Sequence, residues 1–163
     1  RRRAAVVSAG DILKGTLPVL AVRSLAASTG DGAGAWWEVA AALFAVIGST
    51  RSVWVGFKGG RGIATGFGTA LAIAPAALAA AAPFFFILIW RTRLVSLGSI
   101  TAAAAFTPIL IVANAISPTG LDPAIATYAV IGPALVWLAH ADNIARLRDG
   151  TERTFDTGML QRD

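Results

Sequence analysis

A glycine-rich stretch, GFKGGRGIATG at residues 56–66, contains the residues best suited to chemistry in this chain. Its glycines allow backbone N–H groups to turn toward a ligand, because glycine adopts conformations that other residues avoid. A helix expected from about residue 63 would point its positive amino end at the same place. The stretch lacks the residue order of a Walker A loop. It predicts a phosphate-binding loop, with an ordinary charged turn between helices as the alternative. The residues concerned are Lys58, Gly59, Gly60, Arg61 and Gly62.

A second group of polar residues lies near the carboxyl end, in HADNIARLRDGTE at residues 140–152. Asn143 follows His140 by about one helical turn, and Arg146 follows Asn143 by another. A histidine can accept or donate a proton near neutral pH. The spacing therefore favours a catalytic or binding face, with an ordinary interfacial histidine as the alternative.

Two further pairs combine polar side chains with apolar surroundings. Asp11 and Lys14 are three residues apart, so they share one face of a helix and are expected to form either a structural ion pair or part of a functional site. Ser96 and Ser99 follow the basic residues of RTRLVSLGSI (91–100), where they are suited to capping the next helix or to lining a site.

The overall composition limits the kinds of protein that could position these groups. The 163 residues are 56% hydrophobic and only 14% charged, with a mean hydropathy of +0.68. Soluble domains carry about 25% charged residues, so a membrane protein is favoured over an alanine-rich soluble bundle. Without cysteine, disulfides and thiolate metal sites are excluded, and one histidine cannot form a multi-histidine metal site. No metal or cofactor is expected.

Six hydrophobic segments predict an all-α, polytopic membrane bundle with six spans. The third segment is short for a span of about 20 residues, and Pro75 could instead kink one longer helix. The segments are residues 4–27, 36–48, 62–74, 76–90, 96–116 and 123–140. We treat residues 1–163 as one membrane domain, with 141–163 forming a cytoplasmic motif and tail.

The basic residues support this count. If the chain alternates through six spans from a cytoplasmic start, all 14 Lys and Arg residues except Lys14 and Arg23 fall on one side. The other side receives residues 28–38, the turn at Pro75 and residues 117–123, which contain neither type. Basic residues accumulate on the cytoplasmic side of membrane proteins. The net charge of +5 therefore indicates orientation in a membrane, not nucleic-acid binding.

Four motifs in order resemble one known family. DILKGTLPVL, GFKGGRGIATGFG, RTRLVSLGSI and NIARLRDGTE are similar to motifs of the bacterial acyl-phosphate-dependent glycerol-3-phosphate acyltransferases, the PlsY family. The resemblance covers nearly the whole chain. It implies seven transmembrane helices in the bacterial inner membrane and a site facing the cytoplasm. It also implies acyl transfer from acyl phosphate to glycerol 3-phosphate, with lysophosphatidic acid and phosphate as products and without a metal.

The resemblance also implies roles for individual residues. Lys58 and its glycines would hold phosphate, Arg61 would replace a lysine, and Thr65 would end the same motif. His140 and Asn143 match the catalytic pair that orients the substrates. The remaining matches are Glu152, which closes the last motif, and the serine pair Ser96 and Ser99 near the pocket.

Three departures from the family pattern are visible. The chain begins after the place where the family has its first helix and a Ser/Gly/Asn/Ala/Thr-rich motif, so we expect a truncated copy. Ser49 stands where a histidine is common, and Ala141 stands where an arginine is common. These changes leave open a divergent specificity or a weakened enzyme. The alternative function is a non-catalytic membrane protein, either an anion carrier or a degenerate family member.

Overall fold

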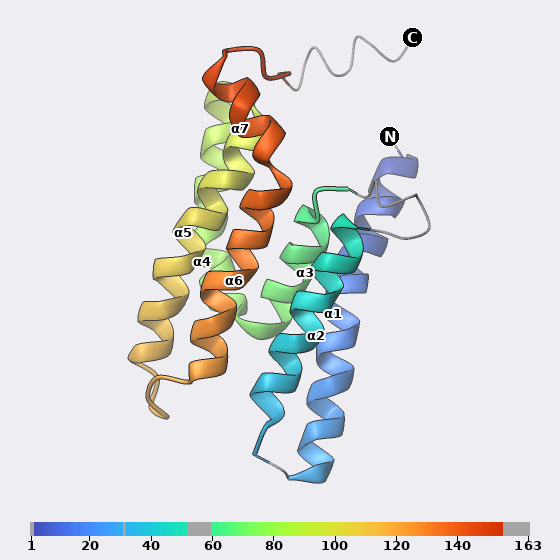
Figure 1. The fold of residues 1–163 in the computed structure, drawn as a ribbon, viewed down its shortest axis with the longest axis vertical. Coiled ribbons are helices and arrows are strands. Elements are labelled where there is room, and N and C mark those ends of the chain that lie inside the picture. Colours follow the sequence, from blue (N-terminus) through green and yellow to red (C-terminus); the bar gives the residue numbers. More distant parts are fainter. Residues whose placement is uncertain (1, 31, 52–59, 155–163) are drawn as a thin grey trace.

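The computed structural model describes residues 2–30, 32–51 and 60–154, and in these ranges all regular structure is helical (Figure 1). Each of the six predicted hydrophobic segments lies on one helix, which confirms the all-α fold. A short seventh helix follows. The helices are α1 (Arg2–Thr29), α2 (Gly34–Thr50), α3 (Ile63–Ile73), α4 (Pro75–Thr92), α5 (Val95–Ala115), α6 (Pro123–Ala139) and α7 (Ala141–Arg148).

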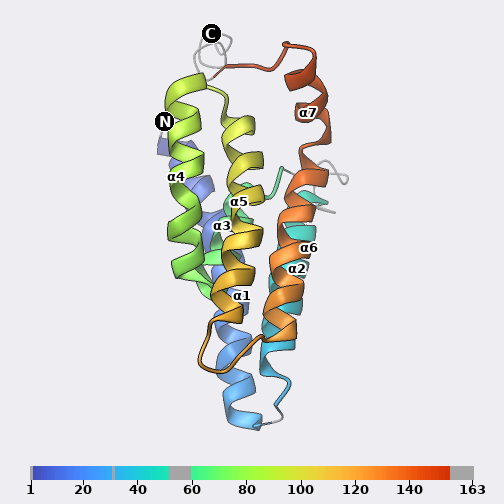
Figure 2. The ribbon, with the colours of Figure 1, turned by 90° about the vertical axis from the view of Figure 1, so that its left-hand side faces the viewer.

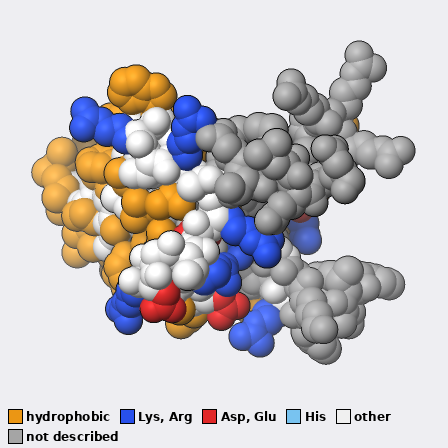
Figure 3. Space-filling view, turned by 90° about the horizontal axis from the view of Figure 1, so that it is seen from above, with side chains coloured by type: hydrophobic (Ala, Val, Ile, Leu, Met, Phe, Trp, Pro, Cys, Tyr) orange, Lys and Arg blue, Asp and Glu red, His pale blue; other side chains and the backbone are white. Residues whose placement is uncertain are grey.

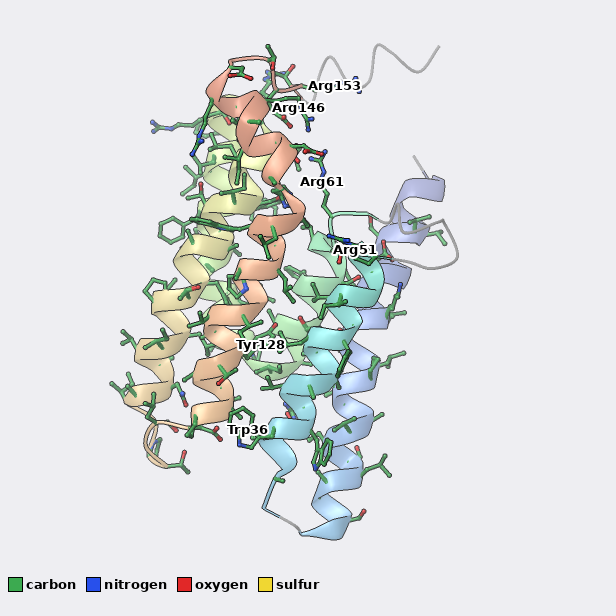
Figure 4. The ribbon with its side chains drawn as sticks, in the orientation of Figure 1. Trp36, Arg51, Arg61, Tyr128, Arg146 and Arg153 are labelled. Carbon is green, nitrogen blue, oxygen red and sulfur yellow. The ribbon has the colours of Figure 1, made fainter. Side chains whose placement is uncertain are left out.

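The first six helices run alternately up and down in an elongated bundle, and the turn between the short α3 and α4 lies near its middle (Figures 1 and 2). The end that carries α7 also carries labelled arginines, and we call it the cationic end; its labelled members are Arg51, Arg61, Arg146 and Arg153 (Figure 4). Trp36 lies at the opposite end, with half of its surface exposed. Seen from above the cationic end, Lys and Arg side chains border a flank of hydrophobic ones (Figure 3). The labelled arginines thus gather toward one end, as the sequence predicts for the basic residues.

Pro75 separates two helices and does not kink one. Ala74 has φ −145° and ψ 66°, outside the helical region, and Pro75 starts α4 at its first turn. A proline fits there because the first N–H groups of a helix have no partner within the helix. The chain reverses at this point, so α4 runs back toward the cationic end (Figure 1).

The six-span count is not confirmed. Helices α4 and α5 are long and apolar enough to cross a membrane, and the bent pair of α6 and α7, with an angle of 62°, would make a third span. Helix α2 is apolar but has 17 residues, and α3 has 11. At 1.5 Å per residue α3 is about 16 Å long, roughly half of a hydrocarbon core.

Small residues let α1 and α3 pack closely. A Cβ atom on Gly15 would overlap the carbonyl oxygen of Thr65, and one on Gly68 would overlap that of Ile12. Thr16 adds a hydrogen bond from its hydroxyl to the Gly68 carbonyl oxygen, at 3.0 Å. Close approach of this kind increases van der Waals contact where lipid removes the hydrophobic drive between helices.

An ion pair lies where α3 ends. Arg23 on α1 donates to Glu38 on α2 at 2.6 Å and to the carbonyl oxygen of Ala72 at 2.9 Å. That carbonyl belongs to the last turn of α3, where four such groups lack partners within the helix. Of the two alternatives for Asp11 and Lys14, the ion pair does not form; among the described residues the ion pairs join Arg23 to Glu38 and Arg146 to Glu152.

Candidate functional site

Most of the predicted site residues lie at or near the cationic end, but not in one contact network. Lys58 and Gly59 lie outside the described residues, so nothing is said of their structure. His140, Asn143, Arg146 and Glu152 come from the junction of α6 and α7 and the segment after it. The other described residues come from α1 (Asp11, Lys14), the start of α3 (Gly60, Arg61, Gly62, Thr65) and the start of α5 (Ser96, Ser99).

His140 lies between α6 and α7 and is only 2% exposed. Its Nδ1 is 2.7 Å from the carbonyl oxygen of Val136. A carbonyl oxygen can only accept, so Nδ1 carries the hydrogen, and in the neutral ring Nε2 is left as an acceptor.

Glu152 connects α5 to α7. Its Oε1 accepts hydrogen bonds from Ser96 at 2.9 Å and from Asn143 at 2.6 Å, while its Oε2 accepts one from Arg146 at 2.9 Å. Burial acts to raise the pKa of Glu152, but these three donors outweigh it, so the pKa lies below its ordinary value. The ionised carboxylate therefore fixes three side chains at once.

Asn143 has one polar atom without a partner. The residue is 1% exposed, and its Nδ2 must be the atom facing Glu152, because a carboxylate only accepts. Its Oδ1 thus points away from Glu152, and it is the buried side-chain oxygen or nitrogen that has no hydrogen bond anywhere in the described ranges. A buried acceptor left in this state costs about 1–3 kcal/mol, so it indicates a binding position for a donor.

The start of α3 forms the described part of the glycine-rich loop. Gly62 has φ +68°, a conformation that favours glycine, and a Cβ there would lie 2.7 Å from Cγ2 of Thr50. No side chain of the described residues caps the amino end of α3, so its first N–H groups remain suited to an anion. Arg61 is exposed beside them (Figure 4).

Thr65 and the two serines have different surroundings. Thr65 is fully buried and donates to the hydroxyl of Ser49 at 2.9 Å, so Ser49, one of the departures from the family pattern, hydrogen-bonds to a predicted site residue. Ser96 joins Glu152, whereas the Ser99 hydroxyl donates to the Val95 carbonyl oxygen at 2.9 Å within its own helix. Of the two serines, only Ser96 belongs to the network around Glu152.

An apolar cavity of about 170 Å³ lies between α3, α4, α5 and α6, toward the middle of the bundle from His140. Ser99 and Val136 line it, and Val136 also holds His140. Sequence reasoning missed Tyr128, a further lining residue that is 3% exposed and bonded to Thr69 at 2.8 Å. One signal was available, because Tyr128 is the only tyrosine in the chain and lies within an apolar segment.

The sequence model of the family described as glycerol-3-phosphate acyltransferase matches residues 1–150. A protein of that name from Geotalea daltonii is 41% identical over 155 residues, covering 95% of this chain and 74% of the relative. Another from Geobacter sulfurreducens is 37% identical over 146 residues, covering 90% of this chain and 69% of the relative. The chain belongs to the glycerol-3-phosphate acyltransferase family.

Two solved structures share this fold. Both are of PlsY, an integral membrane glycerol 3-phosphate acyltransferase, in a glycerol 3-phosphate form and in a lysophosphatidic acid form. The first has a TM-score of 0.81 and 30% identity, covering 99% of this chain and 76% of the other. The second has a TM-score of 0.79 and 31% identity, covering 94% and 73%. The chain is thus an integral membrane acyltransferase.

Proposed function

We propose that the protein transfers an acyl chain from an acyl phosphate to glycerol 3-phosphate, producing lysophosphatidic acid and phosphate. The site would face the cytoplasm from the bacterial inner membrane, since basic residues favour that side. The observation that carries the proposal is the buried, unpartnered Oδ1 of Asn143 one helical turn from His140.

Asn143 is suited to orienting the glycerol. Its Nδ2 is engaged by Glu152, and its free Oδ1 can only accept a hydrogen bond. Of the two substrates, glycerol 3-phosphate has hydroxyl groups that can donate one. Asn143 therefore holds the acceptor substrate in place, and positioning of this kind supplies a large part of many rate enhancements.

His140 is suited to accepting the hydroxyl proton. Its Nδ1–H is held by Val136, which leaves Nε2 of the neutral ring as the base. The glycerol oxygen attacks the acyl carbonyl carbon, and the new ester C–O bond forms as the bond from that carbon to the phosphate oxygen breaks. Phosphate leaves with the bonding electrons, and the hydroxyl proton goes to His140. An acyl phosphate is already activated, so no covalent enzyme intermediate is needed.

Two anionic substrates must meet at this site, and the start of α3 favours anions. Arg61 supplies a positive charge there, and the amino end of α3 supplies backbone N–H groups. Lys58 and Gly59 would extend the same phosphate-binding loop. The acyl chain would enter the apolar cavity, whose lining includes Val136 one turn before His140.

The test is release of phosphate from palmitoyl phosphate, with and without glycerol 3-phosphate, by the protein in bicelles. Release should depend on glycerol 3-phosphate, and Asn143→Ala should lower kcat/KM about 10-fold to 150-fold, as expected for losing a hydrogen bond of about 1.4–3 kcal/mol. His140→Gln and Lys58→Ala should each nearly abolish turnover.

A matched control distinguishes loss of Arg61 at the proposed phosphate-binding loop from loss of any basic residue at the cationic end. Arg148 is exposed on α7 near the same end, so Arg148→Ala should keep activity while Arg61→Ala raises KM for glycerol 3-phosphate. Full activity in both Asn143→Ala and His140→Gln would refute the site. Absence of acyl transfer by a folded wild-type protein would refute the function.

A further inference from the structure

We propose that Tyr128 forms the floor of the acyl-chain channel and sets the length of the chain that the enzyme prefers. The inference rests on the proposed acyl transfer and deepens it, since it concerns which acyl phosphates the same site selects.

The apolar cavity has a definite direction within the bundle. Near the cationic end its lining includes Ile63 at the start of α3, Ser99 near the start of α5 and Val136 near the end of α6. Farther from that end it is lined by Phe106 and Tyr128. The cavity thus runs from just below His140 toward the middle of the bundle, where Figure 4 places Tyr128.

The tyrosine ring is held from several sides. Its hydroxyl bonds to Oγ1 of Thr69 at 2.8 Å, and Thr69 itself donates to the Gly66 carbonyl oxygen at 2.9 Å. Phe106 packs edge-on against the ring, with centroids 6.2 Å apart. Tyr128 is 3% exposed and Thr69 is fully buried. A ring fixed by α3 and α5 cannot rotate aside without breaking buried contacts.

The hydroxyl groups of Tyr128 and Thr69 at this floor have their hydrogen-bond partners within the protein. Thr69 gives its hydrogen to Gly66, so the Tyr128 hydroxyl donates to Thr69. The hydroxyls therefore need no ligand, and the surface left facing the channel is an aromatic ring. Such a surface suits the terminal methyl group of an acyl chain.

The distance from His140 to the floor follows from the number of residues that separate His140 and Tyr128 along α6. His140 lies twelve residues after Tyr128, which corresponds to about 18 Å along a helix. An extended chain of tetrahedral carbons with bonds of about 1.5 Å advances about 1.25 Å per carbon, so roughly 14 carbons span this depth. A chain near the length of myristoyl is expected to reach the floor, with the cavity of about 170 Å³ holding only its terminal part, and a longer chain must bend or leave the channel.

The experiment compares kcat/KM for lauroyl, myristoyl, palmitoyl and stearoyl phosphates. Tyr128→Leu should lower the floor and raise the ratio of palmitoyl to myristoyl by about 15-fold, because each buried methylene is worth about fourfold. Tyr128→Phe keeps the ring and should leave the ratio unchanged. Leu138→Ala, at an α6 residue that is 73% exposed, is the matched control and should also leave it unchanged.

A second variant acts in the opposite direction and covers the case in which Tyr128→Leu does not fold. Ala103 lines the channel one turn before Phe106. Ala103→Leu should favour lauroyl over myristoyl and palmitoyl by fourfold or more. Unchanged ratios in a folded Tyr128→Leu protein and in Ala103→Leu would overturn the assignment of the floor. If the wild type transfers none of the four acyl chains, the proposed function itself fails.

Discussion

Replacing Glu152 with glutamine tests whether the carboxylate positions Asn143 for reaction. The carboxylate accepts from Ser96, Asn143 and Arg146, and its side chain is only 9% exposed. A glutamine side chain offers one acceptor oxygen and one NH₂ group. The amide oxygen of the glutamine can accept the hydrogen bonds from Ser96 and Asn143. Its NH₂ group then faces Nε of Arg146, which is also a donor, so the bond to Arg146 is lost.

The magnitude follows from the bonds that change. Losing the charge-assisted bond to Arg146 costs about 1.5 kcal/mol, at the low end of the range because Arg146 is 38% exposed. The Asn143 bond becomes neutral and loses about half its strength, or about 1 kcal/mol. Together these predict a decrease in kcat of about 30-fold to 150-fold. KM for glycerol 3-phosphate should change much less, because positioning acts mainly on the reacting geometry.

The assay is glycerol-3-phosphate-dependent phosphate release, with kcat and KM determined separately. Glu38→Gln makes the same chemical change in the other ion pair and should retain activity.

Thermal unfolding in bicelles supplies a second measurement. The lowered pKa of Glu152 means that its contribution to stability is present above about pH 4.3 and is lost as the pH falls through the lower value of the folded state. The difference in the free energy of unfolding between the wild type and Glu152→Gln should therefore become smaller below about pH 4.

Two results would refute this reasoning. A Glu152→Gln protein with kcat within about threefold of wild type would show that the carboxylate does not position Asn143, since the bonds lost are worth more than that. An equal loss of activity in Glu38→Gln would show that both effects reflect general destabilisation.

Three further variants test other parts of the structure. Arg61→Gln removes the exposed positive charge beside the amino end of α3, so KM for glycerol 3-phosphate should rise, and the difference from wild type should shrink at high salt because salt screens attraction between exposed charges. Gly62→Ala forces an alanine to φ +68° and should lower the free energy of unfolding by about 1–3 kcal/mol, while Gly10→Ala, with open space at its Cβ, should raise it by about 0.5–1 kcal/mol. Arg23→Ala leaves a terminal carbonyl of α3 without its partner and should cost about 0.5–1 kcal/mol in the same unfolding measurement, because the arginine is 43% exposed.

The sequence alone predicted the helices, because each apolar segment ends at polar or glycine-rich residues and the basic residues fall at one end. It left open whether Pro75 kinks a helix or separates two, and the conformation of Ala74 decided for two. The six spans that it predicted are not confirmed, since α3 has only 11 residues. Residues close together in the sequence determine that a segment is helical, but the length and direction of each helix depend on where the chain turns.

The candidate site was predicted in part, for a similar reason. Sequence spacing placed His140 and Asn143 three residues apart, at the junction of α6 and α7 and in the first turn of α7, and the resemblance to the family added Glu152. The three hydrogen bonds that Glu152 accepts could not be predicted, because Ser96 is 56 residues away in the sequence.

Other contacts between distant residues were also missed. Asp11 and Lys14 share a helical face, and an ion pair between them was one of two alternatives left open, yet it is Arg23 that pairs, with a residue 15 positions later on another helix. The bond between Thr69 and Tyr128 spans 59 residues. Sequence periodicity determines which residues share a face of one helix, whereas contacts between helices depend on packing, which only the tertiary structure decides.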